Sequence, residues 1–165
     1  MARHLDRHGE LLTLKLGEEA AAAVREARDY QLLNLADLFV DEGYDELAET
    51  LVRQRTSIDQ GTWGVNWLKE HALRRGDQEE ALTLAERLFW DRPTLDGYRE
   101  LEALARPLDR WDELRKTLIA RLDEEQRHVL LIEIYLRAGE VDQALGRLQE
   151  MNAASAHGPL SIYGW

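Results

Sequence analysis

A fourfold helical periodicity constrains this chain more than any other feature of its sequence. Four residues mark predicted turns, Gly43, Gly76, Asp109 and Gly139, and successive marks lie 33, 33 and 30 residues apart. The eighth residue before every mark is a leucine, and the fifth residue after it is alanine or leucine. Apolar residues recur at steps of three and four on both sides of each mark, which is typical of amphipathic helices with one buried stripe. The sequence therefore predicts four pairs of helices, each pair joined by a tight turn.

The residues at and after the marks suit such turns. Glycine accepts the positive φ that often ends a helix, and Asp109 is a tolerable but weaker substitute for it. An aspartate follows each mark, at Asp45, Asp77, Asp112 and Asp142. We expect these carboxylates to cap the free N–H groups that open the second helix of each pair.

This pattern resembles the tetratricopeptide family, whose unit of about 34 residues has a first helix with spaced apolar and aromatic residues, a glycine turn, an alanine early in the second helix and a closing proline. The residues that match in the second unit are Val65, Leu68, Gly76, Ala81 and Pro93. Those that match in the fourth unit are Leu131, Tyr135, Gly139 and Ala144. The third unit departs from the pattern, because Ala105 replaces the aromatic residue and Pro107 interrupts the end of its first helix. The resemblance implies an all-α, right-handed solenoid of about four degenerate hairpins.

Three regions are expected along the chain. Residues 1–28 would form an N-terminal segment with a covering helix, and 153–165 a tail or the start of a truncated further helix. The four repeats between them, over 29–152, are expected at about 29–60, 61–93, 94–125 and 126–152. A terminal hairpin without a polar cap exposes its apolar edge, so we expect either that the tail folds back as a cap or that the chain is a fragment of a longer protein, and we favour the fragment. An uncapped end also invites self-association, which predicts a homodimer through the C-terminal hairpin.

In the family that the chain resembles, the first helices line a concave groove that takes peptides or partner helices. The positions that face this groove, mapped from the turn marks, are Tyr30, Trp63, Asn66, Glu70, Arg74, Arg99, Arg106, Glu133 and Arg137. The arginines can form bidentate pairs with carboxylates of a partner, and Tyr30 and Trp63 can act as apolar anchors. The alternative is that these charged residues are solvated helix faces that pair with each other.

Composition limits the partners and the setting. The chain carries 21 Lys and Arg against 32 Asp and Glu, for a formal charge of -11. A phosphate backbone would meet net repulsion, so direct nucleic-acid binding is disfavoured. The chain has no cysteine, which fits an intracellular protein, and it has no apolar run long enough for a signal peptide or a membrane span. We expect a cytoplasmic protein that does not bind membranes.

Other residues that bear chemistry lack the context a site requires. His4 and His8 share a possible helix face but have no paired third ligand, and His71 belongs to no HExxH motif. No serine stands in a GxSxG motif, and no phosphate-binding glycine motif occurs. The sequence therefore predicts neither catalysis nor a metal or cofactor.

A second resemblance offers an alternative function. Residues 92–122, followed by 129–145, are similar to the helical C-terminal region of bacterial SWIM zinc-finger proteins. In that family a CxC and CxH module binds zinc, and this chain has no cysteine. The resemblance implies a helical module of a larger zinc-finger protein whose zinc and nucleic-acid-binding module is not in this chain.

Overall fold

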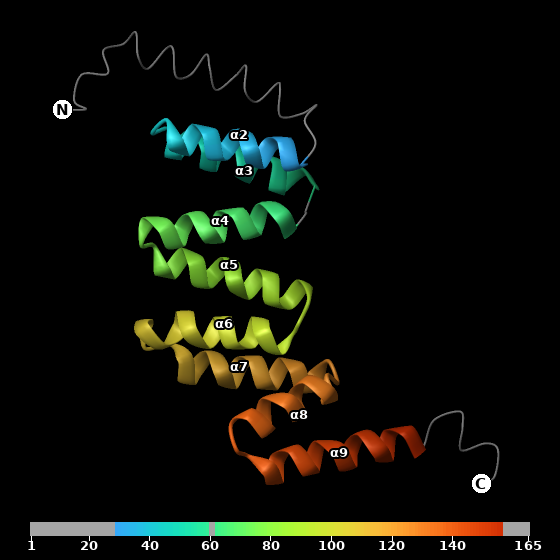
Figure 1. Ribbon diagram of the computed structural model, residues 1–165. Coiled ribbons are helices and arrows are strands. Elements are labelled where there is room, and N and C mark those ends of the chain that lie inside the picture. Colours follow the sequence, from blue (N-terminus) through green and yellow to red (C-terminus); the bar gives the residue numbers. More distant parts are fainter. Residues whose placement is uncertain (1–28, 60–61, 157–165) are drawn as a thin grey trace. The chain divides into compact units, whose positions relative to one another are not determined.

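The computed structural model describes residues 29–59 and 62–156 (Figure 1). Within these residues the chain is all-helical and contains no strand, which confirms the predicted fold class at this level. The helices are α2 (Asp29–Asp41), α3 (Asp45–Asp59), α4 (Thr62–Arg75), α5 (Gln78–Asp91), α6 (Leu95–Ala105), the 3-10 turn η1 (Arg106–Leu108), α7 (Trp111–Glu124), α8 (His128–Arg137) and α9 (Val141–Ala156). The expected covering helix and the histidine pair His4 and His8 lie outside the described residues.

The chain divides into two compact units, Met1–Leu88 and Phe89–Trp165. Helices α2, α3, α4 and most of α5 belong to the first unit. The end of α5 and helices α6 to α9 belong to the second.

All four predicted turn marks have the same backbone geometry. Gly43, Gly76, Asp109 and Gly139 have φ values of 88°, 76°, 55° and 74°. At every mark, the N–H of the marked residue donates to the carbonyl three residues earlier, and the next N–H donates to the carbonyl five residues before it. This pair of bonds is the Schellman motif, which satisfies the last carbonyls of a helix. The positions predicted from the sequence are therefore the points where the first helix of each pair ends.

The expected aspartate caps are found at one turn only. The backbone N–H of Glu80 donates to Asp77 Oδ1 at 3.1 Å. Asp45, Asp112 and Asp142 instead lie within the first turns of α3, α7 and α9, so the prediction that they cap these helices is wrong. These helices begin at or before the aspartate. Each aspartate carboxylate therefore still lies near the positive end of the helix dipole, where a negative charge stabilises the helix.

In the first unit, apolar stripe residues predicted from the repeat are buried in two clusters of the core. Ala48, Val52, Val65 and Leu68 belong to one cluster, which also contains Ala36, and Leu32 belongs to the other. Ala36 and Ala48 have no exposed surface, which allows α2 and α3 to approach closely.

An ion-pair cluster lies beside this core. The carboxylate of Glu49 on α3 lies 3.2 Å from Arg75 and 2.8 Å from Arg53, and 4.0 Å from Nε2 of His71 on α4. His71 is buried and stacks on Trp67 with ring centroids 4.9 Å apart, and neither of its nitrogens has a hydrogen-bond partner. Burial, assisted by the charge of Arg75, lowers the pKa of His71. The imidazole is therefore held in its neutral form.

In the second unit, the predicted stripe residues again form the core. Those buried include Leu101, Ala105, Leu118, Leu131 and Tyr135. Pro107 ends the regular part of α6 as expected, since the chain passes through η1 before the turn at Asp109.

Helix α9 leaves part of its stripe uncovered among the described residues. Ala144 is buried, but Val141, Leu145 and Leu148 are 51%, 51% and 40% exposed. The helix continues beyond Asn152 to Ala156. An apolar face of α9 is thus available for a further contact.

None of the helices in the described part of the chain is both long and apolar enough to cross a membrane.

Candidate binding site

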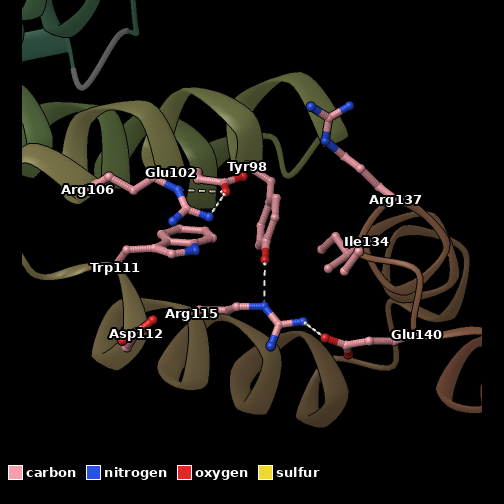
Figure 2. Close-up of a pocket in the computed structure, with 10 residues that line it drawn as sticks. Tyr98, Glu102, Arg106, Trp111, Asp112, Arg115, Ile134, Arg137 and Glu140 are labelled. Carbon is pink, nitrogen blue, oxygen red and sulfur yellow. Dashed lines mark hydrogen bonds and ion pairs between the residues drawn. The ribbon is translucent and has the colours of Figure 1, made fainter.

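The second unit contains a cavity of about 720 Å³ between α6, α7 and α8 and the turn that leads into α9 (Figure 2). Its lining is rich in charged side chains and contains two large aromatic rings. The lining residues are Tyr98, Glu102, Arg106, Trp111, Asp112, Arg115, Ile134, Arg137, Ala138 and Glu140. This composition is suited to binding charged groups rather than an apolar ligand.

A fixed set of contacts forms the base of the cavity. Tyr98 and Trp111 are both buried and meet edge to face, with ring centroids 5.1 Å apart. The guanidinium of Arg115 donates from Nε to Tyr98 Oη at 3.2 Å and from Nη2 to Glu140 at 2.9 Å (Figure 2). Arg115 therefore links α6, α7 and the turn before α9.

The electrostatics of this base follow from burial and hydrogen bonding. Burial raises the pKa of Tyr98, and the hydrogen bond from Arg115 opposes that change only in part. Burial disfavours the charged form of Arg115, but the hydrogen bonds to Tyr98 and Glu140 outweigh it, so the pKa of Arg115 is raised. Arg115 is a permanent cation and Tyr98 a neutral phenol at neutral pH.

The other charged side chains of the cavity are less constrained. Arg106 pairs with Glu102 one helical turn earlier, and its side chain is 63% exposed. The side chains of Arg137, at the end of α8, and Asp112, at the start of α7, have no hydrogen bond or ion pair within the described structure. Figure 2 shows the Arg137 guanidinium toward the upper right, set apart from the other labelled side chains, and Asp112 at the lower left. The cavity therefore presents one cation and one anion that the described chain itself does not neutralise.

The structure brings together two of the predicted groove residues of the second unit. Arg106 and Arg137 line the same cavity. Glu133 lines a different cavity of about 680 Å³, near the starts of α6 and α8. Arg99 is exposed, lies 3.9 Å from Asp96, and lines neither cavity.

The remaining predicted residues belong to the first unit. They are Tyr30, Trp63, Asn66, Glu70 and Arg74. Tyr30 is exposed on α2, whereas Trp63 is half-buried and packs against the core. Asn66 and Glu70 lie on α4, where Glu70 is exposed, and the guanidinium of Arg74 lies 6.0 Å from the ring centre of Trp67. None of the five lines either of the two cavities of the second unit.

Reasoning from the sequence does not select several residues that build the cavity, notably Tyr98, Trp111, Asp112, Arg115 and Glu140. One signal points to Arg115. It stands six residues after a turn mark, and the residue at the same distance from the last mark, Leu145, is apolar. A charged residue on a helical stripe indicates a specific partner, and here the partners are Tyr98 and Glu140.

In the first unit, the residue six positions after the turn mark also forms an ion pair with the next hairpin. This residue is Glu49, and its carboxylate pairs with Arg75 at the end of α4. In both units, a charge on the second helix of one hairpin thus contacts the turn region of the next hairpin.

Within the described residues, no group of three or more histidine, cysteine, aspartate or glutamate side chains is arranged to hold a metal ion. The comparisons with known proteins found no matching family model, no matching curated protein and no matching solved structure.

Proposed function

We propose that this chain is a noncatalytic protein-interaction scaffold, a right-handed solenoid of tetratricopeptide-like hairpins that binds a peptide or a partner helix. The observation that carries the proposal is the charged cavity of the second unit, in which Arg137 and Asp112 have no partner from the described chain. Two predicted groove residues, Arg106 and Arg137, line it.

The turns support the repeat architecture. A Schellman motif with a left-handed residue recurs at all four marks, and its hydrogen bonds use equivalent atoms each time. Hairpins that share turn geometry and stripe positions can stack by repeating one interface, which is how helical solenoids form. Small-angle X-ray scattering tests this part, because a solenoid gives an elongated distance distribution, whereas a globular bundle of the same length would refute it.

The cavity supports peptide binding through its chemistry. Arginine guanidinium groups form bidentate hydrogen bonds with carboxylates, and peptides supply both carboxylates and backbone carbonyl acceptors. Tyr98 and Trp111 are fixed by packing, and Arg115 by two hydrogen bonds, so little side-chain entropy remains to be lost at the base of the cavity.

Selection from an unbiased library of displayed random 12-residue peptides tests the function. We expect enrichment of peptides that bind the wild-type chain, and loss of that binding when Arg106→Glu and Arg137→Glu are combined. Arg92→Glu is the matched control, because Arg92 is an exposed arginine of the same unit that does not line the cavity. If no peptide is enriched over the empty support, the proposed function is wrong.

The exposed face of α9 supports a homodimer through the C-terminal end. Val141, Leu145 and Leu148 lie on one stripe of α9, and pairing with a second copy would remove them from water. Sedimentation equilibrium at micromolar concentration tests this proposal. A dimer that Leu145→Glu converts to a monomer supports it, and a wild-type monomer refutes it.

A further inference from the structure

The cavity of the second unit is lined by equal numbers of positive and negative side chains, but not all of them are paired with each other. Three arginines and three carboxylates line it. Arg106 pairs with Glu102, and Arg115 pairs with Glu140, so each of these charges is neutralised within the chain. Arg137 and Asp112 are left over in the described structure, one of each sign.

The two internal ion pairs differ in how easily a ligand can displace them. Arg115 holds two partners at once, which keeps the Arg115–Glu140 pair in place. The Arg106–Glu102 pair joins residues one helical turn apart, and Arg106 is largely exposed. Such exposed pairs contribute little to stability, so Arg106 can turn to a ligand carboxylate at small cost.

A ligand of a single charge sign does not match this arrangement. An acidic segment could pair with Arg137, but it would also meet Asp112, Glu102 and Glu140 in a chain whose formal charge is -11. A basic segment could pair with Asp112 but would be repelled by Arg137. A segment with both signs neutralises both unpaired groups, and like charges placed against them select against the reverse orientation.

We infer that the cavity binds a mixed-charge peptide segment in a fixed direction, with an acidic side chain on Arg137 and a basic side chain on Asp112. This inference rests on the proposed function and adds to it the chemistry and orientation of the peptide. Arg106 supplies a second, adjustable contact for the acidic end, and Arg115 holds the base of the cavity.

The test uses one peptide enriched by the 12-residue library selection and reciprocal charge reversal. We expect the enriched sequences to share one acidic and one basic position at constant spacing. Arg137→Glu should raise the Kd for such a peptide roughly tenfold, and changing the acidic peptide residue to lysine should restore affinity for that variant only. Asp112→Lys should behave in the same way with the basic peptide residue changed to glutamate. Fluorescence anisotropy with labelled peptides measures all of these affinities.

Controls separate binding from folding. Asp112 lies in the first turn of α7, so Asp112→Lys loses a favourable helix-dipole interaction, and Asp112→Asn provides a milder variant. Each variant is checked by thermal melting followed by circular dichroism, and Arg92→Glu should leave the Kd unchanged.

The outcomes distinguish this inference from the function on which it rests. Enriched peptides of one charge sign, or enriched peptides indifferent to Arg137→Glu and Asp112→Lys, overturn the mixed-charge site while peptide binding stands. Loss of binding without rescue by the reversed peptides also overturns it. Absence of any enriched peptide overturns both.

Discussion

The contact between α3 and α4 makes Gly64 a sensitive backbone position in the first unit. A Cβ atom at Gly64 would lie 1.9 Å from Thr56 Oγ1 and 3.2 Å from Thr56 Cβ. The Thr56 side chain is buried, and its hydroxyl donates to the carbonyl of Val52 at 2.8 Å. Gly64→Ala therefore requires either a different Thr56 rotamer or separation of the two helices.

The sign of the effect depends on two opposing contributions to the free energy of unfolding. Alanine stabilises a helix relative to glycine by at most about 1 kcal/mol. Forcing an extra methyl group into a packed contact costs about 1 to 3 kcal/mol, and a separation of 1.9 Å places this case near the upper end. We expect Gly64→Ala to lower the free energy of unfolding by about 1 to 2 kcal/mol.

In a chain that also carries Thr56→Ala, Gly64→Ala should no longer lower the free energy of unfolding. Removing Oγ1 eliminates the shortest contact, and the remaining distance of 3.2 Å to Cβ needs a shift of only a few tenths of an ångström. In the Thr56→Ala background, Gly64→Ala should be neutral or stabilising by up to about 1 kcal/mol, because the gain in helix propensity then exceeds the cost of the remaining contact. The two substitutions should thus show a coupling energy of about 2 kcal/mol, typical of residues in direct contact.

Urea denaturation of the wild type, the two single variants and the double variant, followed by circular dichroism, measures this cycle. Gly97→Ala in the second unit is the control, because its Cβ would lie 3.1 Å from the ring edge of Phe89, a side chain that can shift slightly. We expect a small change there. The reasoning is refuted if Gly64→Ala has the same effect in both backgrounds, or if it stabilises the otherwise wild-type chain.

Three further predictions concern single side chains. The pKa of His71 is lowered in the folded chain, so the unfolded state binds more protons. The free energy of unfolding should therefore fall as the pH drops below about 6.5, by up to about 1.4 kcal/mol per pH unit. Urea titrations at several pH values measure this slope, and His71→Phe should flatten it. Asp109 has a φ of 55°, so Asp109→Gly should stabilise the chain by about 0.5 to 1 kcal/mol in urea denaturation, and no gain would contradict the cost assigned to this conformation. The guanidinium of Arg121 lies 3.9 Å from the ring centre of Trp90, so Arg121→Ala should lower the melting temperature by a few degrees. Glu125→Ala is the control, because it removes only exposed ion pairs and should change the melting temperature little.

The helices and their turns can be predicted because both depend on local rules. Helical periodicity requires apolar residues at steps of three and four, and a helix that ends in a left-handed residue favours glycine. Asp109 shows how far this extends, since its place in the repeat identifies a turn that its residue type alone would not. The helix starts are less predictable, because a difference of one or two residues decides whether an aspartate caps a helix or lies inside it.

The candidate site can be predicted only in part. The distances of Arg106 and Arg137 from the turn marks select both residues, and both line the cavity. Trp111 is buried, and the structure also places it in the cavity lining. Tyr98 is buried too, and its hydroxyl nevertheless reaches Arg115.

The sequence by itself determined the helical class of the described residues, the four turn positions and most of the buried stripes, since each follows from residues close together in the chain. The tertiary structure alone decided that Arg115 contacts residues 17 and 25 positions away, and that Gly64 lies against Thr56. It also decided that Arg137 and Asp112 line one cavity without partners from the described chain. These features depend on which side chains meet when separate helices pack, and helical periodicity assigns a residue to a face without determining what lies opposite it.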